Sequence, residues 1–166
     1  MKKFILACVI LFIVNMGCKK TNADGGAPCG CSPVMGPSFS LVIKNSAGQD
    51  LLNPQTTAAL TQEKIELYRK DAGGKIIPLN FSIRQPFTYG NEKFTFYQLY
   101  INDLSFINDA GDNTAYLKLG NGPVRQVNVF LGQNPVLVNK VLVDKKEIES
   151  DKDNGKTYLS IFYLTE

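Results

Sequence analysis

From Phe39 onward, short apolar runs alternate with polar residues at a period of two, and this pattern constrains the fold more than any other feature. In SFSLVIKN, Phe39, Leu41 and Ile43 share one face of an extended strand, because successive side chains of a strand point to opposite faces. The same alternation recurs in KIELYRK (64–70) and in IPLNFSI (77–83). The glycine-containing DAGGK between these two runs predicts a hairpin turn.

The remaining chain continues in the same way. KFTFYQLYIND (93–103) is apolar on both faces and predicts a central strand covered on both sides, and AYLKLG, VRQVNVFLG, VLVNKVLVD and TYLSIFYL predict four more strands. Asn154 and Gly155 are the strongest hairpin signal. About eight short strands predict an all-β domain, an antiparallel β-sandwich of immunoglobulin-like or transthyretin-like type, with a partly closed β-barrel as the alternative. A short connecting helix is expected over Thr56–Gln62.

The segment GQDLLNPQT (48–56) lies between the first two strands. Asp50 and Asn53 are expected to bond nearby backbone amides, and Leu51 with Leu52 to cover an open end of the sandwich. The alternative is that these polar groups line a ligand site. We favour the structural interpretation.

The chain begins with the organisation of a secretory signal. Two lysines form a basic start, and an apolar run of eleven residues follows from Phe4 to Val14. A membrane-spanning helix needs about 20 apolar residues, so the run is too short for a transmembrane anchor. We therefore predict that residues 1–17 are a lipoprotein signal peptide and that the mature chain begins at Cys18.

The sequence NMGC at the end of this signal resembles a bacterial lipobox, in which a small residue before the cysteine allows cleavage after diacylglycerol has been attached to the thiol. Gly17 matches that pattern, whereas Met16 and Asn15 differ from its usual residues, as in the relaxed lipoboxes of Bacteroidota lipoproteins. The resemblance implies a lipid on Cys18, and stable anchoring needs about two acyl chains. An ordinary signal cut after Ala23 is the alternative.

Two further segments, VIKNSAGQDLLNPQT (42–56) and TAYLKLGNGPVRQVNV (114–129), are similar to parts of small Bacteroidota lipoproteins. The resemblance implies a sandwich-like domain anchored at a membrane, and it implies no particular reaction. Glycine and proline are frequent in residues 18–37, which predicts a flexible linker after the lipidated cysteine. The folded domain is then expected over residues 38–166.

The charge balance does not favour nucleic acid as a partner. The full chain carries 18 basic and 15 acidic side chains, and loss of Lys2 and Lys3 leaves 16 against 15. A nucleic-acid-binding surface needs a basic face or stripe, whereas the lysines and arginines here are scattered among acids.

Only Cys29 and Cys31 remain once the signal is removed and Cys18 is lipidated. In an oxidising compartment this pair could close a small ring, pair between molecules or bind a soft metal. Metal is the weakest of these, because the chain contains no histidine to complete a zinc site. The simplest alternative is that both cysteines lie in the linker and have no function.

The residues available argue against an enzyme and against a cofactor. Without histidine there is no Ser-His-Asp or Cys-His relay, and the carboxylates stand mainly in predicted turns. We therefore expect no catalytic residues and no dedicated metal site. Weak calcium candidates are Asp109, Asp112 and Asn113, since calcium accepts irregular loops of oxygen ligands.

Three function classes follow, in this order: a structural or protein-binding accessory lipoprotein, a glycan or small-ligand binder, and an enzyme. Tyr116 and Tyr158 are the candidate ligand-binding residues, because both are expected to face outward and glycan sites use exposed aromatic rings. We expect an outer membrane lipoprotein whose partners are the membrane, through Cys18, and an envelope protein. Two lysines directly after Cys18 favour the periplasmic side over surface exposure.

Overall fold

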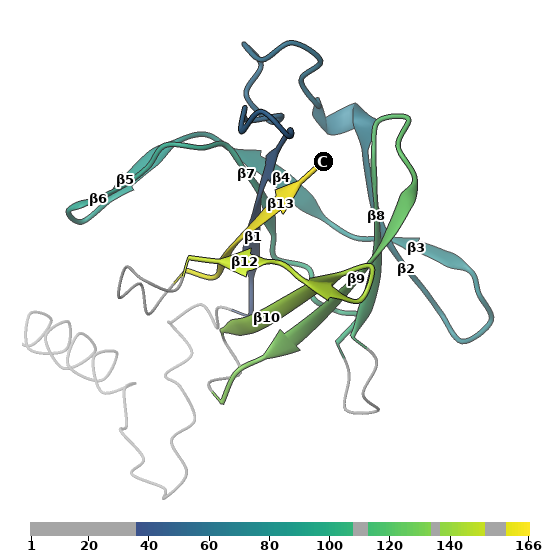
Figure 1. The fold of residues 1–166 in the computed structure, drawn as a ribbon. Helices are drawn as coiled ribbons and strands as arrows, with labels where there is room; N and C mark the ends of the chain where they lie inside the picture. The colour runs from purple at the N-terminus through teal and green to yellow at the C-terminus, as the bar shows by residue number, and fades with distance from the viewer. Residues whose placement is uncertain (1–35, 108–112, 134–136, 152–158) are drawn as a thin grey trace, which may run out of the picture. The chain divides into compact units, whose positions relative to one another are not determined.

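Two β-sheets face each other across an apolar core, which confirms the predicted all-β sandwich (Figure 1). The computed structural model describes residues 36–107, 113–133, 137–151 and 159–166. The described part of the chain contains thirteen strands, more than the eight or so expected, because several predicted strands are divided and short edge strands are added.

The first sheet has five strands in the order β12-β13-β1-β7-β4. They are β12 (Glu149–Ser150), β13 (Ile161–Thr165), β1 (Phe39–Lys44), β7 (Gln98–Ile101) and β4 (Phe81–Arg84). Its neighbours are antiparallel except β1 and β13, which run parallel from the pair Ser40 and Ile161 to the pair Lys44 and Thr165. This is the one parallel pair among the described strands of the otherwise antiparallel sandwich, and here the first and last strands of the fold lie side by side (Figure 1).

The second sheet has six antiparallel strands in the order β11-β10-β9-β8-β2-β3. They are β11 (Lys146–Glu147), β10 (Val138–Val143), β9 (Val124–Leu131), β8 (Thr114–Leu119), β2 (Ile65–Lys70) and β3 (Ile76–Pro78). Both sheets end in edge strands within the described residues, so the barrel alternative is not supported. Two more strands, β5 (Phe87–Tyr89) and β6 (Glu92–Phe94), pair only with each other there and form what we call the ribbon.

The core is built from the inward residues of both sheets. In β8, Ala115, Leu117 and Leu119 are buried while their neighbours are partly exposed, as the period of two requires. Leu41 of β1 and Leu117 of β8 are fully buried in the same apolar cluster. Burial of such side chains contributes about 1.5–3 kcal/mol each and holds the two layers together.

The hairpin predicted at DAGGK is confirmed, whereas the strand predicted after it is divided. Asp71 Oδ1 accepts the backbone N–H groups of Gly73 and Lys75, both at 2.9 Å, in the turn between β2 and β3. The chain then leaves the six-stranded sheet after Pro78 and enters β4 of the other sheet at Phe81. Pro78 lacks a backbone donor and lies on the edge strand β3, where proline is tolerated, and Leu79 still donates to the Leu67 carbonyl at 2.9 Å before the chain crosses over.

The strand predicted over residues 93–103 is also divided. Its second half, β7, lies between β1 and β4 and is the expected central strand. Its first half belongs to β6 of the ribbon. The interruption coincides with a tertiary contact, because the Tyr97 N–H donates to Asp50 Oδ2 at 2.7 Å.

The segment over residues 48–56 has the predicted structural role. Asp50 is buried and its Oδ1 also accepts the Leu52 N–H at 2.9 Å, while Asn53 Oδ1 accepts the Gln55 N–H at 3.0 Å. Leu52 is buried in the core. The helix expected over Thr56–Gln62 is wrong, because these residues form turns followed by one 3-10 turn, η1 (Gln62–Lys64).

Candidate functional site

Most of the residues that the sequence singled out lie outside the described part of the chain. These are Cys18, Cys29, Cys31, Asp109, Asp112 and Tyr158, together with the turn at Asn154 and Gly155. Of the calcium candidates, Asn113 is described, and its Oδ1 accepts a hydrogen bond from Asn128 Nδ2 at 3.2 Å. The structure thus shows Asn113 in a contact between two amide side chains.

Tyr116 lies on the outward side of the six-stranded sheet, opposite Tyr68 of β2. The two rings stack with their centroids 5.3 Å apart and an angle of 16° between their planes. The ammonium of Lys70 is 4.7 Å from the centre of the Tyr116 ring. Tyr116 is therefore part of an aromatic and cationic cluster instead of an isolated exposed ring.

The same side of the sheet continues with amides and exposed apolar groups. Gln126 of β9 pairs across the strands with Tyr116, and its Nε2 donates to Asn128 Oδ1 at 3.4 Å. Phe130, farther along β9, is 36% exposed, and Lys140 Nζ lies 4.7 Å from its ring centre. We call this surface the tyrosine face, and its main residues are Tyr68, Tyr116, Gln126, Asn128, Phe130 and Lys140.

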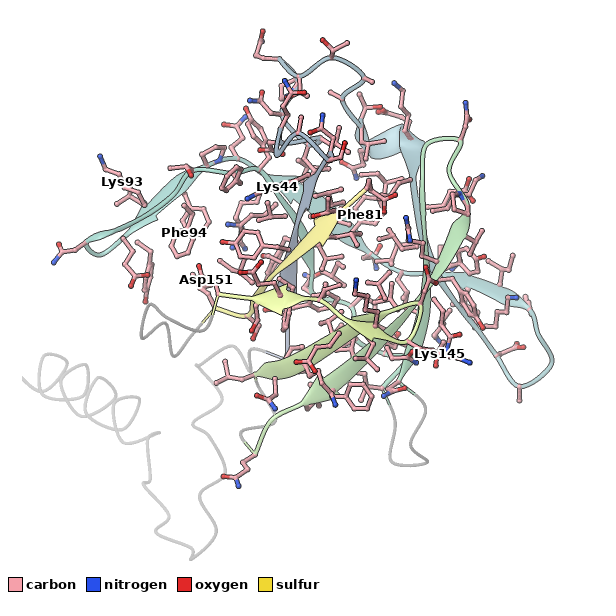
Figure 2. The ribbon with its side chains drawn as sticks, viewed as in Figure 1. Lys44, Phe81, Lys93, Phe94, Lys145 and Asp151 are labelled. Atoms are coloured by element: carbon pink, nitrogen blue, oxygen red, sulfur yellow. The ribbon has the colours of Figure 1, made fainter. Side chains whose placement is uncertain are left out.

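A second candidate site lies between the ribbon and the five-stranded sheet. Figure 2 shows Phe94 and Lys93 on the ribbon, and Asp151 after β12. Phe87 and Phe94 stack at 4.7 Å across the two strands of the ribbon, and the Arg84 guanidinium of β4 lies 5.3 Å from the Phe87 ring centre. Phe94 packs with two sheet residues, Val42 and Ile161, in a small apolar cluster separate from the main core.

Beside this cluster is an open pocket of about 180 Å³, which we call the ribbon pocket. Three buried sheet residues, Val42, Gln98 and Ile161, line it together with aromatic side chains. Its lining residues are Val42, Lys93, Phe94, Thr95, Phe96, Gln98, Asp151, Ile161 and Tyr163. The pocket therefore combines apolar, aromatic, amide and charged side chains.

Gln98 is the unusual residue of the ribbon pocket. Its side chain is 2% exposed, and its Oε1 has no hydrogen-bond partner among the residues that the structure describes. An unpartnered buried acceptor costs about 1–3 kcal/mol in desolvation. The sequence contained a signal that we did not use, namely one polar residue within the otherwise apolar and aromatic run FYQLYI.

Charged groups surround the open side of the pocket. Lys44 Nζ lies 3.9 Å from the Phe96 ring centre and 4.8 Å from that of Tyr163, so the ammonium contacts two aromatic rings. The Tyr163 hydroxyl lies 3.5 Å from Asp151 Oδ2. Burial raises the pKa of Tyr163 above its ordinary value of 10.0, and the negative charges of Asp151 and Glu149 raise this pKa further.

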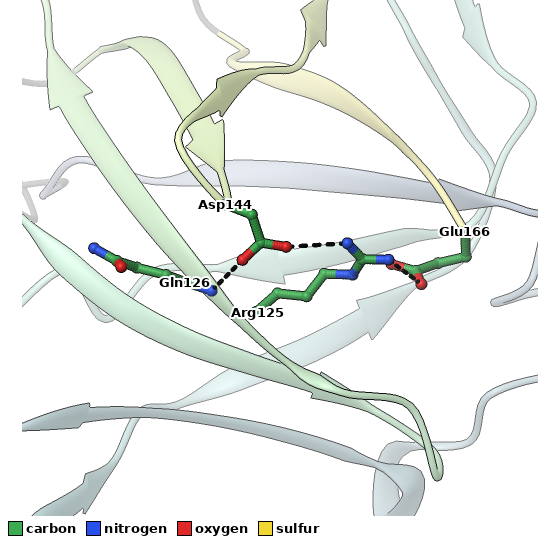
Figure 3. A network of polar contacts seen from close by, with 4 residues as sticks. All are labelled: Arg125, Gln126, Asp144 and Glu166. Atoms are coloured by element: carbon green, nitrogen blue, oxygen red, sulfur yellow. Dashed lines mark hydrogen bonds and ion pairs between the residues drawn. The ribbon is translucent and has the colours of Figure 1, made fainter.

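Apart from the tyrosine face and the ribbon pocket, a cluster of charged side chains joins the two sheets and has a structural role (Figure 3). Arg125 of β9 donates from Nη2 to Glu166 Oε2 at 2.9 Å and from Nη1 to Asp144 Oδ2 at 3.1 Å. The Glu166 contact and the Asp144 contact raise the pKa of Arg125. Glu166 directly follows β13, so this guanidinium connects the six-stranded sheet to the end of the five-stranded one.

Two features are absent from the described ranges: a cluster of metal-ligating side chains and a membrane-spanning helix. No three His, Cys, Asp or Glu side chains are grouped there in a way that could hold a metal ion. No helix in those ranges has the length and apolar content of a membrane span. Comparisons of the chain with protein-family models, with curated proteins and with solved structures find no match.

Proposed function

We propose that this chain is a non-catalytic binding module of the cell envelope, of the Bacteroidota lipoprotein type, which binds a protein partner through its tyrosine face. A lipid on Cys18 holds it at the outer membrane, on the periplasmic side, and residues 18–37 connect the lipid to the domain. The lipobox-like NMGC supports the anchor, and the lysines after Cys18 support the orientation.

The observation that carries the proposal is the composition of the tyrosine face. Val124 and Phe130, two outward residues of β9, are 48% and 36% exposed, and Tyr68 and Tyr116 stack on the strands β2 and β8 of the same sheet. Aromatic residues are enriched in protein interfaces, and buried tyrosines contribute disproportionately to their binding energy. An open sheet face with these residues is therefore suited to a protein surface.

The charges of this face define the partner further. Lys118 is paired with Glu66 at 2.7 Å, whereas Lys70 and Lys140 make no ion pair with another described residue. Both ammonium groups instead lie over aromatic rings. The complementary partner surface has an apolar centre and acidic residues at its rim.

The ring arrangement favours a protein over a sugar at this face. A sugar ring stacks on a free aromatic face, and Tyr116 shares one of its faces with Tyr68 while Lys70 also contacts the ring. A glycan would have to separate these groups first. A protein surface can cover the stacked pair without disturbing it.

The test is co-purification of the tagged full-length protein from its own membranes in mild detergent. We expect one partner in near-equal amount, and we expect the double variant Val124→Glu, Phe130→Glu to lose it. The matched control is Tyr89→Glu, because Tyr89 is 60% exposed on the ribbon, at the opposite end of the fold from β2 and β3 (Figure 1). Equal recovery with the double variant, or recovery of nothing above background, contradicts the proposal.

The anchor is tested separately with Cys18→Ser. We expect this variant to leave the membrane fraction and to incorporate no labelled fatty acid. Protease added to intact cells is expected to spare the wild-type protein, because the domain is on the periplasmic side. Membrane retention of the variant, or digestion in intact cells, contradicts the anchor or the orientation.

A further inference from the structure

We propose that the ribbon pocket binds one neutral, polyhydroxylated ring, such as a single hexose or the terminal hexose of a glycan. This goes beyond the protein-binding function proposed for the tyrosine face, since it assigns a second site with a different ligand on the other sheet. Four features of the pocket support it: its size, the buried acceptor of Gln98, its aromatic walls and its mixed charges.

The size limits the ligand to a single ring. The pocket has a volume of about 180 Å³. A cavity of roughly 150 Å³ holds a benzene molecule, whereas drug-sized ligands occupy pockets of about 300–1,000 Å³. A six-membered ring with small substituents fits this range.

The Gln98 side chain favours a ligand that donates a hydrogen bond. Leu99 and Ile101 of β7 point into the main core, so Gln98 points to the opposite side of the sheet, where it lines the pocket. Its Oε1 is buried and accepts no hydrogen bond from the described residues. A ligand hydroxyl at this place would satisfy that acceptor. A purely apolar ligand would leave it without a partner, at a cost in affinity.

The walls and the rim favour a neutral ligand with several hydroxyl groups. Phe94 and Phe96 contribute apolar ring atoms to the lining, while Phe87 stacks on the first ring and Lys44 lies over the second. Lys93 can donate and Asp151 can accept at the rim, and a hydroxyl group does both. Groups of both charges lie near the lining residues. The ammonium of Lys44 lies over Phe96, and the negative charge of Glu149 contributes to the raised pKa of Tyr163. Neither an anionic nor a cationic ligand is therefore preferred.

The test is saturation-transfer NMR on the full-length protein, in a detergent without a sugar headgroup, with D-glucose, D-galactose and D-mannose as probes. We expect at least one hexose to bind with a dissociation constant on the order of millimolar. Phenol, which has one hydroxyl on an apolar ring, and D-glucuronate, which is charged, are expected to bind at least tenfold more weakly.

Two variants locate the binding. Gln98→Met removes the acceptor at similar volume, and Thr95→Trp fills the pocket from an exposed position without changing the core. We expect each to weaken hexose binding tenfold or more, while Tyr116→Ala on the tyrosine face leaves it unchanged. The proposal is overturned if no hexose binds, if binding survives in both variants, or if phenol or glucuronate binds more tightly. Partner recovery through the tyrosine face is independent of each of these outcomes.

Discussion

The two sides of the five-stranded sheet differ in chemistry although they are built from neighbouring residues. On the inner side, Leu41 and Leu99 are fully buried in a core made of aliphatic and phenyl groups. The outer side carries Val42, which follows Leu41 in sequence, and Gln98, which precedes Leu99. Both are also buried, and they lie near Phe94 of the ribbon. The inner side is therefore packed from apolar groups, whereas the outer side holds a buried acceptor that has no hydrogen-bond partner in the part of the chain that the structure describes.

Within this one sheet, the inner side therefore stabilises the fold, and the outer side carries the candidate binding pocket. Close packing of apolar groups stabilises the sandwich, and it leaves no polar group for a ligand to satisfy. The outer side is less well satisfied, because the carbonyl oxygen of Gln98 lacks a donor among the described residues and Lys44 contacts two rings. A buried polar group without a described partner is rare in folded proteins and needs an explanation, of which a bound ligand is one.

The largest expected effect compares two adjacent residues of β1. Leu41→Ala should lower the free energy of unfolding by about 2–5 kcal/mol, because it leaves a cavity in the main core. Val42→Ala should lower it by about 1–3 kcal/mol, because fewer methyl groups are removed from a smaller cluster. Urea denaturation followed by circular dichroism measures both. A larger loss for Val42→Ala would reverse the comparison.

A smaller effect is expected from the cluster that joins the two sheets. Arg125→Ala should lower the free energy of unfolding by about 1–2 kcal/mol, because it removes two charge-assisted hydrogen bonds from a partly exposed position. The control is Lys118→Ala, whose single pair with Glu66 is more exposed and should cost less than about 1 kcal/mol. Equal losses would show that the Arg125 contacts add nothing beyond an ordinary surface pair.

The Gln98→Met variant should change stability in the opposite direction. Removing an unpartnered buried acceptor at similar volume should raise the free energy of unfolding by about 1 kcal/mol in the absence of ligand. Leu99→Ala, the neighbouring inward change, should lower it by about 2–5 kcal/mol. Thermal and urea unfolding of the two variants test this. A clear loss of stability in Gln98→Met would show that the Gln98 side chain stabilises the fold. It would contradict the difference inferred between the two sides of the sheet.

The smallest effect concerns Tyr163 at high pH. Its pKa in the folded protein is raised above 10.0 by burial and by the charges of Asp151 and Glu149. The resulting stability is fully present below the pKa of the unfolded chain, near 10, and is lost as pH rises through the folded value. An ultraviolet titration of the tyrosines, with Tyr163→Phe to assign the signal, should show one late transition. Asp151→Asn should move it to lower pH, and no movement would contradict the assigned cause.

The period-two pattern was sufficient to predict the sandwich and its central strand, because alternation directly reports which side chains face a core. It could not predict where strands change sheets. IPLNFSI has uninterrupted alternation, yet it is divided between β3 and β4, and KFTFYQLYIND is divided where Tyr97 binds Asp50. These breaks depend on contacts between residues far apart in the chain, which a local pattern does not contain.

The candidate sites were predictable to a smaller extent. The outward position of Tyr116 followed from alternation, but its stacking on Tyr68 depends on the register between β2 and β8. The polar residue in FYQLYI was visible in the sequence, whereas its lack of a partner depends on what surrounds it. A pocket is formed by neighbours in space, and Lys93, Asp151 and Tyr163 come from three different segments.

The sequence by itself determined the all-β class, the apolar sides of the strands and the local turns, such as the one that Asp71 stabilises. Each of these depends on interactions between residues a few positions apart. The tertiary structure alone decided the parallel pairing of β1 with β13, the separation of the ribbon, and the burial of Gln98 Oε1 without a partner among the described residues. The physical reason is that these features result from long-range packing, in which burial of the whole core overrides local preference.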